Sequence, residues 1–377
     1  MKQRIIIVGG GLAGLSTAYH LAKTGTAEVI VLEREIRIGA HASGNNAGMI
    51  RQTVSDPVLA GLAAEGRKKL SALKGLRWKK LKFESSGSLL LSDRNENELD
   101  RILKTTGKNQ VPCRSVKKET VSRKVPALGN ASYRRAIFCP TDALVDVGGL
   151  LEGLQKELKR LGVRILLGHP LHSVRNSEGS FILSSGNREF FADKIVNAAG
   201  AWAGEVAKIA GASRPPLKPY LRHLYESRGF GSDSTRWPFV WHLDRGIYFR
   251  PIPKGILASP CDKRFVRLEK TVQKETARLA DQKTRESLRV KLEKFSPSFK
   301  SIKLAAQRTG LRTMAPDGRF VIGEDPSLKK FYWVAGLGGH GVTTSFAVGD
   351  LAARLVLGKK TNAQKVRWAS AGRFVKR

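Results

Sequence analysis

The chain has 377 residues, of which 41% are hydrophobic; this can bury the cores of two or three domains, or of one α/β body with an interleaved second domain, and excludes a disordered protein. No apolar run reaches the length of a membrane span. The 67 Lys and Arg residues against 32 Asp and Glu give a formal charge of +35, which indicates either contact with a polyanion (nucleic acid or an anionic membrane surface) or a generally basic surface. Because the charge is spread along the chain, we favour the basic surface.

Residues 4–33 have the pattern of one βαβ unit, whose first turn is Gly9-Gly10-Gly11-Leu12-Ala13-Gly14. Gly9 permits a tight turn, Gly11 lets the backbone approach a pyrophosphate, and Gly14 lets the helix pack close to the strand. The N-terminus of that helix offers unpaired N–H groups to phosphates. Glu33, at the end of the second strand, is placed to bind ribose hydroxyls. We expect a bound dinucleotide, which on these residues alone can be NAD or FAD.

Two later segments supply further strands for the same sheet. Residues 193–198 form an apolar strand after a helical pattern at 148–161, and lead into a turn containing Gly200. Residues 331–335 form another strand, followed by the glycine-rich turn 336–341 and a helix that runs to about residue 357.

The segments between these strands have a different character. Residues 241–251 alternate as a strand does and are rich in aromatic residues, and residues 265–293 have a charged helical pattern. We therefore predict an α/β fold, with a discontinuous Rossmann-like nucleotide-binding domain and an inserted β-rich α+β substrate domain. The predicted domains are 1–81, 140–211 and 305–358 for the nucleotide, 82–139 and 212–304 for the substrate, and a flexible basic tail at 359–377.

The cysteines Cys113, Cys139 and Cys261 have no paired spacing, so they form neither a zinc motif nor a disulfide framework. We expect no metal and a reducing compartment. Residues 1–8 faintly resemble a signal peptide, but their apolar part already serves as the first strand. We expect a cytoplasmic protein, with a peripheral position at the inner membrane face as the alternative.

Several glycine-rich pieces, in this order, resemble the D-amino-acid oxidase (DAO) superfamily of FAD-dependent oxidoreductases, nearest the branch of glycine oxidase and FAD-dependent D-amino-acid dehydrogenase. They are the first turn with Glu33, then Ser43-Gly44-Asn45-Asn46-Ala47-Gly48, Asn197-Ala198-Ala199-Gly200-Ala201-Trp202, Gly310-Leu311-Arg312-Thr313-Met314-Ala315-Pro316-Asp317-Gly318 and Gly338-Gly339-His340-Gly341-Val342-Thr343-Thr344. The resemblance covers the chain to about residue 358 and favours FAD over NAD.

The resemblance implies FAD held without a covalent bond, because Gly310 stands where some members carry a flavin-linked cysteine. It also implies that the Gly338–Val342 turn directs N–H groups at the flavin. The residues expected to bind the cofactor are Gly9, Gly11, Leu12, Ala13, Gly14, Glu33, Arg34, Ser43, Asn45, Asn46, Ala47, Gly48, Ala199, Gly200, Trp202, Gly338, Gly339, His340, Gly341, Val342 and Thr343.

The resemblance also implies the residues that handle the substrate. Arg312 matches an arginine that holds the substrate carboxylate, a task that suits a planar guanidinium. Tyr248 and Arg222 match groups that share this carboxylate, although packing for Tyr248 and a solvated position for Arg222 are the alternatives. His340 can face the flavin or cap its turn. The apolar Met49, where a polar residue can contact substrate in the dehydrogenase branch, argues against a strongly cationic substrate.

The implied reaction is oxidation of a small amino acid or amine (D-amino acid, glycine or N-methylglycine type) by hydride transfer to flavin, giving an imine that hydrolyses to a keto acid. Oxygen and a quinone are both open as electron acceptors. Three alternatives remain: oxidation of an amino-acid-like modification on tRNA, which would suit the basic charge, dehydrogenation of a 2-hydroxy acid, and a non-catalytic flavoprotein. The oligomeric state is left open.

Overall fold

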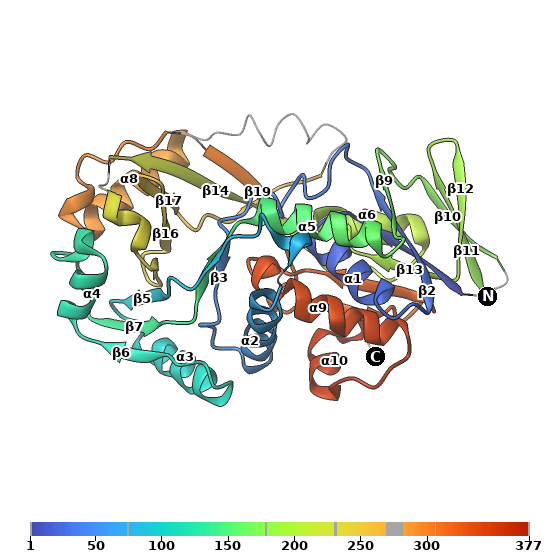
Figure 1. Ribbon diagram of the computed structural model, residues 1–377, viewed down its shortest axis with the longest axis horizontal. Helices are drawn as coiled ribbons and strands as arrows, with labels where there is room; N and C mark the ends of the chain where they lie inside the picture. Colours follow the sequence, from blue (N-terminus) through green and yellow to red (C-terminus); the bar gives the residue numbers. More distant parts are fainter. Residues whose placement is uncertain are drawn as a thin grey trace.

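The computed structural model describes residues 2–73, 75–177, 179–229, 232–268, 282–305 and 307–375. Two large sheets lie side by side along the long axis of the molecule, one of six strands and one of nine (Figure 1). The six-stranded sheet lies at the right of that view, with the N-terminus, and the nine-stranded sheet at the left. The predicted α/β fold with a β-rich second part is confirmed.

The six-stranded sheet is a nucleotide-binding type of sheet, because its five consecutive strands from β21 to β9 are parallel. Its edge strand β20 is antiparallel to β21. In sheet order the strands are β20 (Val321–Glu324), β21 (Phe331–Ala335), β13 (Lys194–Asn197), β1 (Gln3–Val8), β2 (Ala27–Glu33) and β9 (Arg164–Leu167). The carboxyl ends of β1, β2 and β13 therefore meet at one edge, where such sheets bind ligands.

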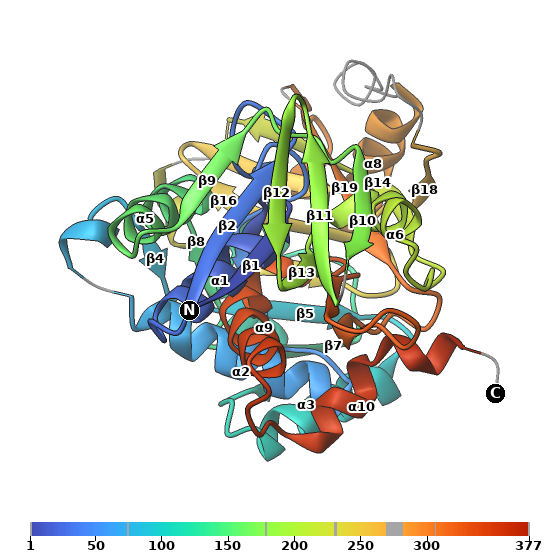
Figure 2. The same ribbon diagram turned by 90° about the vertical axis from the view of Figure 1, so that its right-hand side faces the viewer.

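Alternate residues of β1 face opposite sides of this sheet. Ile5 and Ile7 pack against helices, whereas Ile6 and Val8 pack against a small antiparallel sheet and α6. Figure 2 views the molecule from the end that carries this small sheet. The covering elements are α1 (Leu12–Ala22), α5 (Val147–Arg160) and α9 (Gly341–Val356) on one face, and β10 (Ser173–Ser177), β11 (Ser180–Ser185), β12 (Arg188–Ala192) and α6 (Ala203–Ala210) on the other. Burial of both faces explains why the parallel strands are apolar throughout.

The nine-stranded sheet also has two distinct faces. Phe249 points into a core formed with α8, and its neighbour Tyr248 points to the opposite face. The sheet has the order β18-β14-β17-β16-β15-β5-β7-β6, with β19 paired to β14. The elements are β18 (Arg264–Phe265), β14 (Lys218–Arg228), β17 (Gly255–Ser259), β16 (Ile247–Ile252), β15 (Phe239–His242), β5 (Ser88–Ser92), β7 (Arg135–Cys139), β6 (Arg114–Val116), β19 (Gln307–Met314) and α8 (Gln282–Phe295).

The remaining elements connect or cover the two large sheets. α2 has a clear start signal, because the Asp56 carboxylate accepts hydrogen bonds from the N–H groups of Val58 and Leu59, each at 2.9 Å. These elements are α2 (Pro57–Ser71), α3 (Glu96–Lys108), α4 (Lys118–Lys124), α10 (Ala363–Ala369), the small sheet of β3 (Met49–Ile50), β8 (Ala143–Val145) and β4 (Phe83–Glu84), and the 3-10 turns η1 (Leu76–Trp78), η2 (Pro126–Leu128), η3 (Gly200–Trp202), η4 (Ser232–Arg236), η5 (Pro297–Phe299) and η6 (Ala371–Phe374).

Three expectations about elements can be compared with the structure. The predicted tail is not flexible as far as residue 375: α10 packs on the body of the molecule, where the Trp368 indole N–H donates to Asp56 at 3.0 Å and Lys365 pairs with Glu65 at 2.7 Å. The predicted charged helix is described only from Gln282, as α8; the stretch starts at Phe265 of the strand β18, and residues 269–281 lie outside the described residues. β19 pairs with β14 in the nine-stranded sheet, although its residues fall in the range predicted for the nucleotide domain. The domain bounds stay a prediction.

Within the described residues, the structure has no helix that is both long enough and apolar enough to span a membrane.

Candidate active site

The first turn of the chain adopts a conformation that requires glycine. Gly9 has a φ of +116°, and its N–H donates to the Leu32 carbonyl at 2.8 Å. A Cβ atom on Gly9 would lie 2.4 Å from the Ala198 carbonyl oxygen, and one on Gly14 would lie 2.0 Å from the Gly9 carbonyl oxygen. The turn therefore keeps its shape only because both side chains are absent.

The N-terminus of α1 opens beside this turn. Gly11 is the N-cap and provides no side-chain cap, and the Leu12 N–H donates to the Ser43 hydroxyl at 3.0 Å. Ser43 thereby fixes the loop 39–46 against the start of the helix. The positive end of the α1 dipole faces a cavity at this place, which is the arrangement that binds a phosphate.

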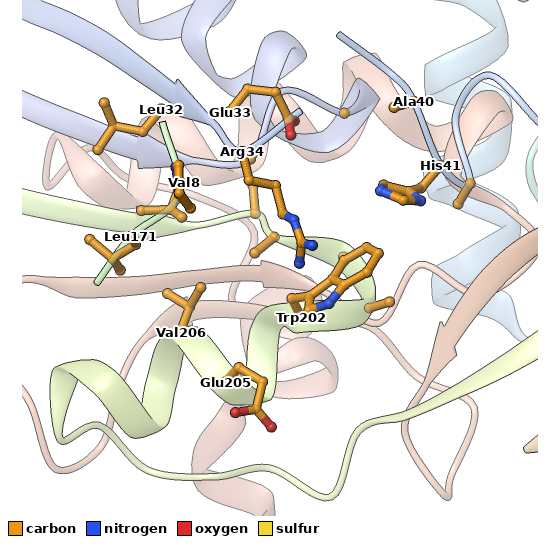
Figure 3. Close-up of a pocket in the computed structure, with 18 of the residues that line it drawn as sticks. Val8, Leu32, Glu33, Arg34, Ala40, His41, Leu171, Trp202, Glu205 and Val206 are labelled. Carbon is orange, nitrogen blue, oxygen red and sulfur yellow. The ribbon is translucent and has the colours of Figure 1, made fainter. Parts of the chain in front are cut away.

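The first cavity lies at the carboxyl end of β1 and β2 and holds about 930 Å³ of empty space (Figure 3). Gly9, Gly11 and Glu33 line it. The two Glu33 oxygens accept hydrogen bonds from the N–H groups of Gly10, at 2.6 Å, and Glu35, at 2.8 Å. A carboxylate has further lone pairs, so Glu33 can still accept hydrogen bonds from two ribose hydroxyls.

Trp202 forms an aromatic wall of the first cavity. The Arg34 guanidinium lies 4.4 Å from the centroid of its ring, and the His41 ring centroid lies 4.4 Å from it as well. Figure 3 shows both side chains next to the indole. His41 also contacts Glu35, with 2.9 Å between Nε2 and Oε1. We expected Arg34 and Trp202 here but missed His41, for which the only signal was its position two residues before Ser43.

A second cavity, with about 860 Å³ of empty space, adjoins the first. The residues that line both are Gly11, Ala42, Ser43, Ala198, Gly200 and Leu311. The two cavities thus form one elongated groove that passes the N-terminus of α1. Its far end lies between the nine-stranded sheet and the turn 338–342.

The start of α9 also faces this groove. The Gly338 N–H donates to the Thr313 carbonyl at 3.0 Å, which attaches the turn to β19. His340 is the N-cap and its side chain makes no capping hydrogen bond. A second helix N-terminus is therefore directed at the second cavity, whose lining includes Gly339, Gly341 and Val342. An elongated groove with one helix N-terminus beside its middle and another at its far end fits a dinucleotide whose far ring becomes negative on reduction.

Arg312, Arg222 and Tyr248 come together on the wall of the second cavity. They belong to β19, β14 and β16, and strand register explains their convergence. Arg222 lies directly opposite Gly310 in the β14–β19 pair, and Gly310 and Arg312, two residues apart, share a face. The loop 39–46 passes close to Gly310: a Cβ atom on this residue would lie only 3.1 Å from the Asn45 carbonyl oxygen.

The electrostatics of this wall favour an anion. Burial, and then the charge of Arg222, lower the pKa of Arg312 to about 10. Arg222 is 6% exposed, and its Nε and Nη1 atoms have no hydrogen-bond partner among the described residues. Burial raises the pKa of Tyr248, so its hydroxyl is protonated at neutral pH. A buried and a half-buried guanidinium with a hydroxyl donor, and no lining carboxylate, can bind a carboxylate ligand.

Many of the residues expected to bind the cofactor line this cavity, among them Leu12, Ala13, Asn45, Asn46 and Ala47. Gly48 and Thr343 are placed differently. Gly48 has a φ of +68° and approaches the Val145 carbonyl, lining a separate hollow instead. The Thr343 hydroxyl accepts from the Arg51 N–H at 3.0 Å and donates to the Met49 carbonyl at 3.3 Å, so it holds the chain rather than facing the groove.

His340 also differs from the other residues of its turn. Gly338, Gly339, Gly341 and Val342 line the second cavity, but His340 does not. Burial, and then the charges of Arg51 and Arg312, hold the pKa of His340 well below its usual value, so the ring is neutral. No group of three or more His, Cys, Asp or Glu side chains in the described part of the chain is placed to hold a metal ion.

Comparison with known proteins agrees with this geometry. The model of the family DAO, described as FAD dependent oxidoreductase, matches residues 4–355. Mitochondrial dimethylglycine dehydrogenase of Homo sapiens is 24% identical over 270 residues, which cover 70% of this chain and 31% of that protein. The chain thus matches about a third of the length of this relative.

Two solved structures share the fold over the whole chain. L-proline dehydrogenase from P. horikoshii superposes with a TM-score of 0.87 at 24% identity, covering 99% of this chain and 98% of that one. Glycine oxidase from Geobacillus kaustophilus superposes with a TM-score of 0.83 at 22% identity, covering 100% of both chains. At these identities the likeness shows a common fold.

Proposed function

Because this chain belongs to the DAO family of FAD-dependent oxidoreductases, we propose that it oxidises the carbon–nitrogen single bond of a small carboxylated amine, of the D-amino acid, glycine or N-methylglycine type. The observation that carries this proposal is the pair of the buried Arg222 and the half-buried Arg312, which faces the flavin end of the groove without a lining carboxylate. A substrate carboxylate would supply the negative charge that the lining of this cavity lacks. Tyr248 donates a further hydrogen bond to it.

The residues of the wall orient the substrate. A guanidinium fork fixes both oxygens of a carboxylate, and this fixes the direction of the adjacent α-carbon. FAD, when bound, accepts a hydride from that carbon. The resulting imine hydrolyses to a keto acid, with oxygen or a quinone as the final electron acceptor.

The same cations favour the reactive form of the amine. A positive potential lowers the pKa of a nearby ammonium group, so the substrate loses its proton on binding. The residues that line the second cavity include no Asp or Glu to oppose this effect or to act as a base. Orientation and charge are therefore what the protein supplies.

We also propose that FAD is bound without a covalent link. Gly310, which lines the second cavity on β19, offers no thiol. The glycine turn, the two helix N-termini and the Trp202 wall provide contacts along the whole groove.

The decisive experiment is anaerobic bleaching of the yellow protein by a panel of D-amino acids, glycine, N-methylglycine, 2-hydroxy acids and modified tRNA. We expect carboxylated amines to bleach the flavin. Arg312→Met should keep the flavin spectrum and lower kcat/KM by about a hundredfold or more, because a charge-assisted bidentate contact is lost. Arg175→Met, which removes a surface arginine paired with Glu189, is the control and should change nothing. Bleaching by 2-hydroxy acids or tRNA alone would refute the proposal.

A further inference from the structure

A third arginine, Arg51, lies beside the wall that carries Arg312 and Tyr248. It follows β3, and its backbone N–H donates to the Thr343 hydroxyl at 3.0 Å, in the first turn of α9. Two residues earlier, Met49 packs with Tyr248 and Leu224. Tyr248 and Leu224 line the second cavity, so Met49 and Arg51 lie directly behind that wall, although neither is among the residues that line the cavity.

The side chain of Arg51 is part of a stack that leads to the wall. Its guanidinium lies 4.2 Å from the centroid of the Trp241 ring, and the Trp241 ring centroid lies 4.6 Å from that of Tyr248. Trp241 and Tyr248 are directly opposite each other on β15 and β16. The stack holds the guanidinium in place through its flat face and leaves its edge of N–H donors available.

The Arg51 guanidinium makes no hydrogen bond and no ion pair with any residue that the structure describes. Asp142 and Glu98 are the carboxylates whose charges act on the pKa of Arg51, and both accept hydrogen bonds from other residues. Asp142 accepts from the Gln52 N–H at 2.8 Å and from the Ser88 hydroxyl at 2.7 Å. Glu98 accepts from the Ser55 hydroxyl at 2.6 Å.

The charge of Arg51 acts on the same groups as the charge of Arg312, which is consistent with the position of Arg51 behind the wall of the second cavity. Arg51 and Arg312 both act on the pKa of His340, and Arg51 contributes to the lowered pKa of Arg312. His340 is neutral and cannot serve as a counter-ion. The three guanidinium groups repel one another, and a bound carboxylate relieves that repulsion. One carboxylate held by Arg312 and Arg222 leaves Arg51 without a partner.

We propose that the site takes a carboxylated amine with a second carboxylate, and that Arg51 binds this second carboxylate. This inference rests on the proposed oxidation of a carboxylated amine, and it names the substrate class. The second carboxylate lies either on the side chain, as in D-aspartate and D-glutamate, or on the nitrogen substituent, as in iminodiacetate. Both forms share the chemistry that an unpaired guanidinium recognises.

The first test compares matched substrates. We expect kcat/KM for D-aspartate or D-glutamate to exceed that for D-alanine, or kcat/KM for iminodiacetate to exceed that for N-methylglycine, by about tenfold or more. The pair that shows the preference identifies which form is the substrate. Arg51→Gln should lower this ratio by about tenfold, and Arg51→Lys, which keeps the charge, should restore part of it. An equal loss for mono- and dicarboxylates in Arg51→Gln would overturn the proposal, because it would indicate a structural role.

The second test measures binding without oxidation. Calorimetric titration of the flavin-loaded protein should show tighter binding of malonate, succinate or glutarate than of acetate or butyrate. Arg51→Gln should weaken only the dicarboxylates, whereas Arg312→Met should weaken both classes. Equal affinity for both classes in the wild type would overturn the inference. This titration also separates the two proposals: if no amine bleaches the flavin, the proposed reaction fails while the titration still tests Arg51.

Discussion

The cofactor end and the substrate end of the groove are built from different groups. At the cofactor end, the groove is formed by backbone and by missing side chains: Gly9 and Gly14 leave no room for a Cβ atom, and the N-terminus of α1 is open. At the substrate end, charged side chains project from strands of the nine-stranded sheet, as Arg312 and Arg222 do.

This difference predicts how each end responds to change. A backbone cradle depends on the fold itself, so a substitution there alters folding and cofactor binding together. A wall of side chains depends on the fold only for the direction of each residue. Its charges can therefore change while the sheet and the cofactor stay in place. The tests below address the two ends in order of expected effect.

The largest effect is expected at the cofactor end. Gly9→Ala should abolish FAD retention and reduce the free energy of unfolding by at least about 2 kcal/mol, because alanine is strained at a φ of +116° and its Cβ would meet the Ala198 carbonyl. The absorbance of bound flavin and urea unfolding measure both quantities. Gly107→Ala is the matched control, because a Cβ atom there meets nothing within 4 Å. Normal flavin content in Gly9→Ala would contradict the backbone cradle.

A smaller effect on stability is expected from a decrease in pH, through a histidine between the helices α1 and α9. His20 on α1 packs edge-to-face on Phe346 of α9, at 6.0 Å between centroids, and burial lowers its pKa to about 4. The unfolded chain then binds more protons than the folded protein below the ordinary histidine pKa, so stability falls as pH decreases. Between pH 7 and pH 5 this group alone should account for a loss of about 2 kcal/mol.

Urea unfolding at the two pH values checks this expectation, with His20→Gln as the comparison. The variant should lose less stability on acidification than the wild type. An identical loss in both proteins would show that other groups govern the acid response.

The smallest effect is expected at the substrate wall. Tyr248→Phe should lower kcat/KM about tenfold and leave the flavin spectrum unchanged, because one hydrogen bond to the carboxylate is lost while the ring stays on Trp241. Steady-state kinetics with the best amine measures the change. Tyr133→Phe, in the core on the other face of the sheet, is the control and should leave kcat/KM unchanged. Loss of flavin in Tyr248→Phe would show that a change at the substrate end also affects cofactor binding, which contradicts the proposed difference between the two ends.

The cofactor end could be predicted largely from the sequence, because its requirements are local. A run of glycines between an apolar strand and a helix has few other uses, and the same holds for the turn before α9. Arg312, Arg222 and Tyr248 were found through family resemblance, and strand register brings them to one wall.

Other features depend on contacts between distant segments and left no local signal. The proposed role of Arg51 depends on its contact with Trp241, and nothing near Arg51 in the sequence indicates this contact. Trp368 buries its ring against Phe320 and donates to Asp56, which turns an apparently flexible basic tail into a packed helix. Thr343 looked like a flavin contact, but its hydroxyl is occupied by Arg51 and Met49.

Gly339 gives the cofactor turn an influence on specificity. A Cβ atom at this position would lie 2.9 Å from Nη2 of Arg312, so the guanidinium occupies the space that a side chain would fill. The size of residue 339 and the position of the Arg312 guanidinium therefore cannot change independently of each other. A larger residue at 339 would shift the Arg312 guanidinium, and on the proposed function this would change how the substrate carboxylate is held without a change in the residues of the nine-stranded sheet.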